Sequence, residues 1–301
     1  MRKFIKYIKE FLFNPMTTLI PLFFMIIFFP EIETDTISSS GSIEKIVSLS
    51  PAITRQIIDL DAEHLLVGVT AYHPPLTRKI DIVGTLVLPN IEKIVLLKPN
   101  IVLLSEEDNK VQFNEMLNST NIRSHTFGRN DSFESICKYY LELATLIDKT
   151  SLAKSKLKTY SKTLRAPPKT TKKMIIALFV SNKPLIGASN KSYIGKIISH
   201  AGAINCLGLL NRPYPIISME HLVMLNPDII ISILYHGNVK PVPFNTILKE
   251  FPELTVMKRK SIYIMPSDYG CSYTPQYYVK AYNLIVRILE KEIKKRNEKK
   301  I

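Results

Sequence analysis

Tyrosine and histidine are the residue types in this sequence best suited to contacting a ligand. The 301-residue chain has 14 tyrosines and no tryptophan. Its six histidines are scattered along the chain: His64, His73, His125, His200, His221 and His236. There is no glycine-rich phosphate loop, no nucleophile elbow and no His-x-x-x-His helix. The motifs therefore give no support to an enzyme.

Two tyrosines stand beside prolines in segments that read as loops. Tyr72 is followed by His73-Pro74, and Tyr214 lies between two prolines. A tyrosine offers flat apolar area and one hydroxyl, which suits contact with a bound molecule. A loop tyrosine beside proline is as often a packing residue, so both roles remain open at this point.

The cysteines give no sign of a metal site. Cys137, Cys206 and Cys271 are odd in number and far apart, so at most one disulfide can form and no metal-ligand spacing is present. We expect them to be small, buried apolar side chains.

The net charge of +14 is concentrated in three segments. Residues 1–14 and 290–301 each carry +3, residues 149–173 carry +9, and the rest of the chain sums to −1. A nucleic-acid-binding protein spreads its Lys and Arg over a folded face with interleaved aromatic side chains. The two ends and one connector carry the charge here, which argues against nucleic acid as a partner.

The first 40 residues are typical of an export signal or membrane anchor followed by a linker. Four basic residues between Arg2 and Lys9 precede a 14-residue apolar run from Met16 to Phe29. A bacterial lipoprotein needs a cysteine just after the apolar run, and no cysteine precedes Cys137, so the sequence is not that of a lipoprotein. Counted from Phe11 the apolar run is 19 residues, about 28 Å as a helix, so an uncleaved anchor is as well supported as a cleaved signal.

The rest of the chain alternates short β-rich runs with helical patterns. Strands are expected at residues 45–49, 67–70, 101–104, 174–180 and 261–265, and helices at 51–60, 133–147, 192–201 and 275–295. This order predicts an α/β fold with parallel sheets flanked by helices.

An internal repeat with a separation of 128 residues predicts two similarly built lobes. Residues 91–103 (IEKIVLLKPNIVL) can be laid on residues 219–231 (MEHLVMLNPDIII). Each copy reads as a short helix that is stopped by proline and turns directly into a buried strand. Two such units, half a chain apart, indicate a repeated architecture.

The domain organisation follows from this repeat. A signal or anchor with its linker occupies residues 1–40, and an N-terminal α/β lobe occupies 43–147. Residues 148–173, rich in lysine and poor in apolar residues, predict a solvated connecting helix and linker. A C-terminal α/β lobe covers 174–290, and a basic tail covers 291–301.

Several motifs resemble those of the periplasmic binding proteins of cobalamin and iron-siderophore ABC importers. In chain order they are KIVSLSPAIT at 45–54, LVGVTAYHPP at 66–75, Val83-Gly84, NIEKI at 90–94, PNIVL at 99–103, Tyr193-Ile194-Gly195, AGAIN at 201–205 and Ser218-Met219-Glu220. The resemblance covers nearly all of residues 43–290. It implies two Rossmann-like lobes joined by a single long connecting helix, with the ligand in the cleft between the lobes.

The resemblance also implies roles for individual residues. Glu92 and Glu220 match a pair of surface glutamates, one per lobe, that contact arginines of the permease. A glutamate in the first turn of a helix is also favoured there by the helix dipole, so a solvated structural role is the alternative. Tyr72 and Tyr214 match aromatic residues of the ligand cleft, and Asp268 matches a further cleft position. The neighbours of these residues, His73, Leu86 and Tyr269, complete the expected ligand-binding set.

Departures from the family pattern bear on the ligand. Leu86 and Ser105 stand where cobalamin binders place tryptophans, and Ser272 lies near where an arginine is expected. Thr85 replaces the tyrosine of haem-binding relatives, which counts against haem. An anionic siderophore requires several converging Arg or Lys side chains, and Arg212 is the only obvious candidate in the matched loops. The remaining loop residues, Tyr235, His236, Tyr269, Tyr273 and Tyr277, form an uncharged, aromatic lining.

These features predict the substrate-binding component of an ABC importer for a cobalt- or iron-containing chelate, a corrinoid or a ferric siderophore, with no cofactor or resident metal of its own. The expected partners are a permease dimer with its ATPase subunits, and the expected location is the periplasm or the outer face of the cytoplasmic membrane. The alternatives are haem, a bare transition metal held between His73 and His236, or a membrane-tethered chelate sensor.

Overall fold

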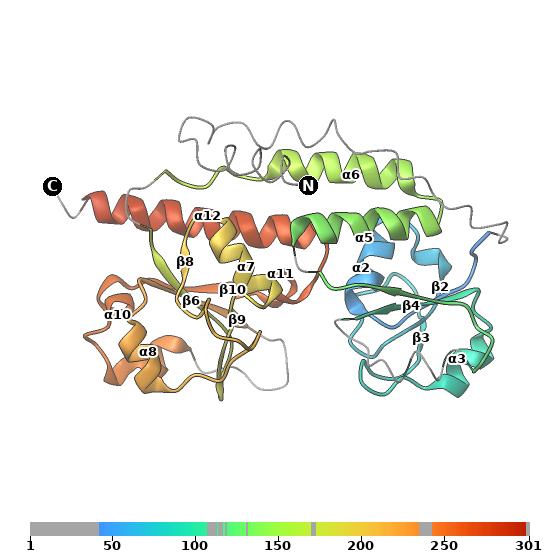
Figure 1. Cartoon of the computed structure of the whole chain (residues 1–301), viewed down its shortest axis with the longest axis horizontal. Helices are drawn as coiled ribbons and strands as arrows, with labels where there is room; N and C mark the ends of the chain where they lie inside the picture. Colours follow the sequence, from blue (N-terminus) through green and yellow to red (C-terminus); the bar gives the residue numbers. More distant parts are fainter. Residues whose placement is uncertain are drawn as a thin grey trace, which may run out of the picture. The chain divides into compact units, whose positions relative to one another are not determined.

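The computed structural model describes residues 42–106, 113, 117, 119–130, 132–169, 173–234 and 243–298. The segment predicted as an export signal or anchor lies outside these residues, as do Tyr235 and His236. In the part of the chain that is described, no helix has both the length and the apolar character needed to cross a membrane. Residues Ser42–Ile301 form one compact unit that contains two α/β lobes (Figure 1).

The first lobe is built on a five-stranded sheet in which all neighbouring strands are parallel. In sheet order its strands are β3 (Asp81–Ile82), β2 (Leu66–Val69), β1 (Ile46–Ser48), β4 (Ile101–Ser105) and β5 (Ser124–Phe127). Its helices are α2 (Pro51–Asp59), η1 (Glu63–Leu65) and α3 (Ile91–Leu97). Every residue of β1 and β4 is buried, because apolar clusters cover both faces of the sheet.

The second lobe repeats this plan around a second sheet. Its strands are β10 (Ile262–Pro266), β9 (Ile229–Leu234), β6 (Ile175–Asn182) and β7 (Leu185–Gly187), with β8 (Ile204–Asn205) also beside β6. Only β7 pairs antiparallel among these described strands. Its helices are α7 (Tyr193–His200), α8 (Met219–Leu225), α9 (Phe244–Ile247), η2 (Leu248–Glu250), α10 (Thr255–Arg259), α11 (Ser267–Cys271) and α12 (Pro275–Glu298).

The predicted repeat is confirmed at the level of single residues. Helices α3 and α8 have bounds that differ by 128, and both end on a residue in the left-handed conformation. Each following strand begins in the same way: the side chain of Asn100 accepts the backbone N–H of Lys45 at 2.7 Å, and that of Asp228 accepts the N–H of Ile175 at 2.9 Å. The repeat is therefore one α-turn-β unit used twice.

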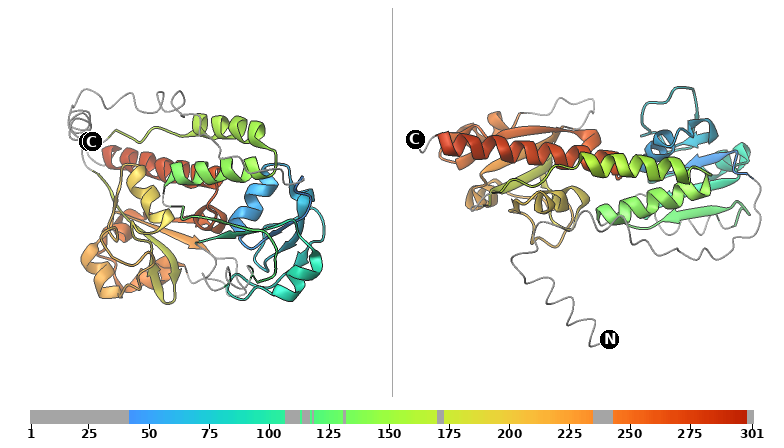
Figure 2. Two further views of the ribbon diagram at one scale, coloured as in Figure 1. Left: turned by 45° about the vertical axis from the view of Figure 1, so that its right-hand side comes forward. Right: turned by 90° about the horizontal axis from the view of Figure 1, so that it is seen from above.

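Three helices link the two lobes on one side of the sheets: α5 (Phe133–Leu146), α6 (Thr150–Thr163) and α12 (Figures 1 and 2). The lysine-rich connector was expected as one helix within 148–173, and α6 fills only its first part. Helix α5, expected within the first lobe, contributes to both cores, because Ile136 packs in the second lobe and Tyr140 in the first. The link is thus a pair of helices packed on α12.

The end of α12 differs from the basic tail expected at 291–301. Residues as far as Glu298 remain helical, and three of them are anchored to the second sheet. Ile293 packs against the apolar core, Arg296 pairs with Asp228 at 2.6 Å, and Glu292 is only 2% exposed. The lysines alternate with these buried positions, so the segment is the amphipathic end of α12, which runs to Glu298, three residues past the expected helix end at 295.

Glu292 is a buried carboxylate whose removal should be costly. It accepts hydrogen bonds from Ser261 Oγ at 2.7 Å, Tyr263 Oη at 2.5 Å and Lys295 Nζ at 2.5 Å. Burial raises the pKa of Glu292, but these three hydrogen bonds outweigh burial and leave its pKa below the ordinary value. The carboxylate thus ties α12 to β10.

We predict that Glu292→Gln lowers the free energy of unfolding by about 2–4 kcal/mol, because buried donors lose a charged acceptor. Thermal unfolding at pH 7 measures this loss. Since the folded-state pKa of Glu292 is lowered, its contribution is complete above the unfolded pKa and is lost as pH falls through the folded value. The difference between variant and wild type should therefore shrink in acid.

Glu290→Gln, on the same helix but half-exposed in its pair with Arg165, should cost under about 1 kcal/mol. Equal losses for the two variants would contradict the assignment.

Candidate functional site

Most of the predicted ligand-binding residues follow the carboxyl ends of strands. Tyr72 and His73 come after β2, Leu86 after β3, and Asp268 and Tyr269 directly after β10. The carboxyl ends of parallel strands meet at one edge of a sheet, where α/β proteins bind ligands. The fold therefore gives each lobe a loop edge that carries candidate residues.

The loops after β2 and β3 are joined to each other. The N–H of Ala71 donates to the carbonyl of Gly84 at 2.9 Å, so the segment before Tyr72 lies against the segment before Leu86. Gly84 has a φ of +106°, and a Cβ there would lie 2.5 Å from the carbonyl oxygen of Leu88. Glycine is thus required for this turn. On the joined loops Tyr72 is 69% exposed, so its ring contributes little to packing and is available to a ligand.

His73 is held in an orientation suited to binding a metal. Its Nδ1 lies 2.7 Å from the carbonyl oxygen of Pro74, a contact that favours the proton on Nδ1. This tautomer leaves the lone pair on Nε2, and no hydrogen bond to Nε2 is found among the described residues. A histidine that donates from one nitrogen to a carbonyl is the usual state of a metal-ligating imidazole.

Tyr214 lies along the outer side of β7 and does not follow a strand end. The residues around it pair with β7, since the N–H of Gly187 donates to the carbonyl of Pro215 at 2.9 Å and that of Ile217 donates to Leu185 at 2.8 Å. The flanking prolines have no N–H to donate, which suits the edge of a sheet. Tyr214 is 40% exposed, so this edge presents part of its ring to solvent.

Asp268 makes a contact between the lobes. Its Oδ1 accepts a hydrogen bond from Arg55 of α2 at 2.6 Å, and Arg55 also reaches Tyr277 Oη at 3.3 Å with its guanidinium over the Tyr277 ring. The ring of Tyr269 lies 6.0 Å from that of Tyr277. The carboxylate of Asp268 is thus paired with a cation, and its role toward a ligand stays a prediction.

Arg55 and Gln56 are interlobe residues that the sequence did not reveal. Gln56 Nε2 donates to the carbonyl of Tyr273 at 2.9 Å, beside the Arg55–Asp268 pair. Both belong to α2, whose apolar residues face the first core. The only available signal was that Arg55 is the one cation in an otherwise uncharged stretch between Pro51 and Ile58.

The two predicted docking glutamates occupy equivalent places in the repeat. Glu92 and Glu220 are both the second residue of their helices, α3 and α8, and both are exposed. The pKa of Glu220 is lowered by hydrogen bonds from its own backbone N–H and from the hydroxyl of Ser218. The first turns of the two helices are capped in the same way. The N-cap side chain of Asn90 accepts the N–H of Lys93, and that of Ser218 accepts the N–H of His221.

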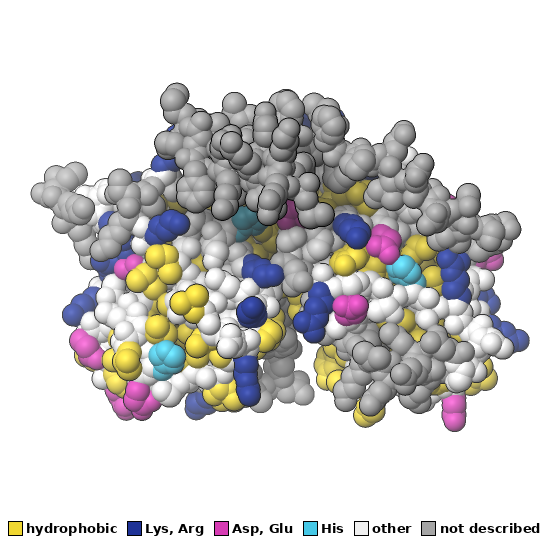
Figure 3. Space-filling view, viewed as in Figure 1, with side chains coloured by type: hydrophobic (Ala, Val, Ile, Leu, Met, Phe, Trp, Pro, Cys, Tyr) yellow, Lys and Arg dark blue, Asp and Glu magenta, His cyan; other side chains and the backbone are white. Residues whose placement is uncertain are grey.

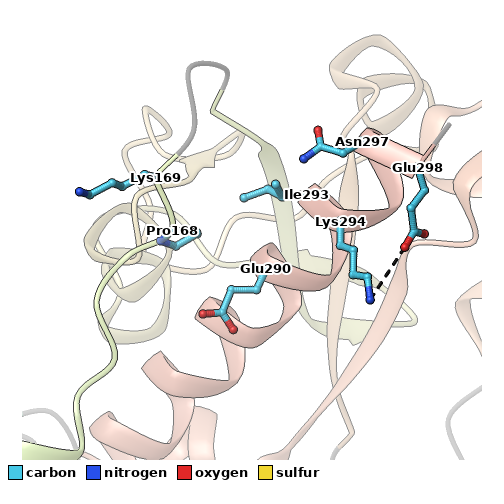
Figure 4. A pocket seen from close by; sticks show the side chains of 7 residues that line it. All are labelled: Pro168, Lys169, Glu290, Ile293, Lys294, Asn297 and Glu298. Atoms are coloured by element: carbon cyan, nitrogen blue, oxygen red, sulfur yellow. Dashed lines mark ion pairs between the residues drawn. The ribbon is translucent and has the colours of Figure 1, made fainter. Parts of the chain in front are cut away.

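Other features of the described residues contribute no further ligand site. A surface depression of about 420 Å³ lies beside the end of α12 (Figure 4) and is lined by Pro168, Lys169, Glu290, Ile293, Lys294, Asn297 and Glu298. None of the predicted site residues lines it. Within the described ranges no group of three or more His, Cys, Asp or Glu is arranged to hold a metal ion. Cys137 and Cys206 are free thiols whose pKa burial raises to about 12.

The sequence matches the family model described as "Periplasmic binding protein" over residues 46–241. This match covers well over half of the chain and runs from the first strand of one lobe past β9 of the other. The chain belongs to this family. The fold-level prediction is therefore confirmed, and the chain is a substrate-binding protein of a family whose members bind and do not catalyse.

Individual relatives of this binding protein differ in the ligands that their names give. The high-affinity heme uptake system protein IsdE of Staphylococcus aureus (strain Newman) is 29% identical over 223 residues, 71% of this chain and 74% of IsdE. The solved structure of the vitamin B12-binding protein BtuF of Vibrio cholerae has a TM-score of 0.66 at 19% identity and covers 82% of this chain and 97% of BtuF.

A third relative is a possible iron-binding solute-binding protein from Staphylococcus epidermidis, with a TM-score of 0.68 at 19% identity. That match covers 83% of this chain and 99% of the other. At such identities these two structures establish the fold of the binding protein and nothing finer. The family assignment also implies that the protein is exported across the cytoplasmic membrane.

Proposed function

We propose that this binding protein captures a metal chelate at its strand-end loops and delivers it to the permease of an ABC importer. The observation that carries the proposal is the pair of joined loops after β2 and β3. They present an exposed tyrosine, Tyr72, next to a histidine, His73, whose Nε2 is left as a lone-pair donor. A flat aromatic surface beside a potential axial ligand suits a metal held in a large organic ring.

A metal tetrapyrrole, haem or a corrinoid, fits the described loops better than an anionic siderophore. A siderophore with several negative charges requires converging cations. Arg55 is already paired with Asp268, which leaves exposed Arg212 as the cation of the matched loops. The sequence counted against haem because Thr85 is not a tyrosine. Two observations favour haem: the chain is similar to a heme uptake protein, and His73 offers an axial ligand in place of the tyrosine. Haem is therefore as well supported as a corrinoid.

The remaining parts of the proposal concern delivery. The partner is a permease dimer with ATPase subunits, and Glu92 and Glu220 supply one anion to each half of that dimer. The N-terminal hydrophobic segment either directs export and is removed or holds the protein at the outer face of the cytoplasmic membrane. The bare-metal alternative depends on His236, which lies outside the described residues, and the chelate sensor depends on the N-terminal segment, which also lies outside them, so both stay predictions.

Absorption spectroscopy of the full-length protein in mild detergent tests the ligand class. Hemin, aquacobalamin, whose axial water can be exchanged for an imidazole, and a neutral ferric hydroxamate siderophore would each be titrated into wild type, His73→Ala and the matched control His64→Ala, whose histidine is exposed in η1. We expect one tetrapyrrole to bind in a one-to-one ratio. His73→Ala should shift its absorption bands and weaken binding about tenfold or more, while His64→Ala changes neither.

Two outcomes would contradict this proposal. Binding of the siderophore alone would overturn the preference for a tetrapyrrole. A wild-type spectrum in the His73→Ala complex would remove His73 as an axial ligand, and the tyrosine surface would then have to account for binding by itself.

A further inference from the structure

Helices α3 and α8 carry more apolar residues than their packing uses. Each has five apolar residues among seven, yet only Ile94 of α3 and Leu222 of α8 are fully buried. Ile91 and Leu97 pack partly on one core, and Met219, Val223 and Leu225 on another. Leu96 and Met224 belong to neither cluster and are 78% and 84% exposed. Leu96 and Met224 are thus the most exposed large apolar side chains of their helices, and Val95 of α3 is exposed to a smaller extent, at 43%.

These two exposed side chains occupy the same position in the repeat. Leu96 and Met224 are separated by 128 residues, as are Glu92 and Glu220. Within each helix the glutamate and the apolar residue are four positions apart, which places them on one helix face about 5–6 Å apart at their Cβ atoms. Single exposed apolar residues are common on protein surfaces and need no explanation. A glutamate and an exposed apolar residue that recur on both lobes at the same spacing do need an explanation.

The carboxylates of Glu92 and Glu220 are exposed to a partner, and that of Glu220 also accepts hydrogen bonds from its own first turn. Lys93, next to Glu92, is turned toward β3, where it donates to the carbonyl of Ile82 at 2.8 Å and pairs with Asp81 at 3.2 Å. Among the described residues no ion pair is formed by Glu92 or Glu220. Figure 1 places α3 and α8 in different lobes, both on the side away from α5, α6 and α12. Figure 3 shows apolar and acidic surface near each of them.

We infer that Leu96 and Met224 are apolar anchors that dock the protein on its permease, each inserting beside the site that receives the neighbouring glutamate. This inference rests on the proposed function. A surface with the same carboxylate and apolar pair in two copies is complementary to a partner that has two equivalent halves, each with a cation next to an apolar hollow. Buried apolar anchors supply affinity, while charge pairs supply orientation and association rate. Methionine and leucine suit such anchors because their side chains adapt to a hollow.

Photo-crosslinking in cells tests the contact independently of the ligand. The full-length chain would carry a benzophenone amino acid at position 96, at position 224, or at position 264. Ile264 is an exposed apolar residue on the edge strand β10, and serves as the control. We expect positions 96 and 224 to crosslink to one and the same polypeptide, a permease with transmembrane spans, and position 264 to give no such product. Crosslinks from 96 and 224 to different proteins, or to none, would overturn the inference.

Variants then separate this inference from the proposed function. Leu96→Gln with Met224→Gln should keep chelate affinity and thermal stability at wild-type values, because both side chains are exposed. Uptake of the labelled tetrapyrrole should fall at least tenfold, while Ile264→Gln leaves it unchanged. Normal uptake by the double variant would refute the anchors and leave chelate capture standing. Failure of wild type to bind any chelate would refute the proposed ligand, while a shared crosslink from 96 and 224 would still support the docking surface.

Discussion

Reversing both docking charges, Glu92→Lys together with Glu220→Lys, is expected to reduce chelate uptake by at least a hundredfold and leave chelate affinity unchanged. Placing a lysine against a permease cation replaces an attraction with a repulsion and leaves a desolvated charge unpaired, and each such change costs about 2–5 kcal/mol. Both glutamates are exposed, so the folded protein loses only the favourable interaction of each carboxylate with the N-terminus of its helix. Single reversals should give intermediate uptake, because each half of the permease is contacted separately.

The measurement is uptake of radiolabelled chelate by cells that depend on the variant chain, together with a titration of the purified protein. Glu44→Lys and Glu298→Lys serve as matched controls, since both side chains are exposed glutamates outside α3 and α8. These controls should transport at the wild-type rate. If chelate affinity collapses along with uptake in the double variant, Glu92 and Glu220 belong to the ligand site and the docking role is wrong.

Removing the two exposed tyrosine rings, Tyr72→Ala with Tyr214→Ala, is expected to weaken chelate binding about a hundredfold. A buried aromatic contact with a flat ligand contributes roughly tenfold or more for each ring. The thermal midpoint should change little, because Tyr72 is largely exposed and Tyr214 lies at an exposed sheet edge. Affinity is measured by calorimetry on the full chain.

The corresponding phenylalanine variants distinguish the two properties of tyrosine. Tyr72→Phe and Tyr214→Phe keep the flat apolar area and lose the hydroxyl, so affinity should remain within about threefold of wild type if stacking dominates. A loss as large as that of the alanine variants would instead assign the hydroxyl to metal ligation or to a hydrogen bond. Affinity unchanged in the alanine double variant would remove both residues from the site.

Features encoded in local sequence were predictable. The repeat gave the positions of α3 and α8 and of the strands that follow them, because a short apolar helix, a proline stop and a β-branched run leave few alternatives. The helix start at Phe133 was also predicted, and the side chains of Ser132 and Ser135 form the capping box there. The repeat also predicted two similarly built lobes, and the family resemblance supplied the ligand cleft expected between them.

Features that depend on tertiary pairing were not predictable from local patterns. The Arg55–Asp268 contact joins residues 213 positions apart, and no local spacing marks either one for the other. The amphipathic pattern of α5 predicts that one face of the helix is buried. It does not predict that this face packs against the cores of both lobes. The helix was predicted as far as residue 295, but the burial of Glu292 within it was not, because buried glutamates are rare. The pairing of residues 213–217 with β7 likewise arises only in the folded sheet.

Calorimetric titration of the full-length protein with metal chelates tests the central proposal most directly. Capture of a chelate at the strand-end loops predicts that hemin or cyanocobalamin binds in a one-to-one ratio with a dissociation constant below about 10 μM. The metal-free porphyrin should bind more weakly than hemin if His73 ligates the metal. Absence of binding tighter than about 10 μM to hemin, cyanocobalamin and ferric siderophores alike would contradict the account.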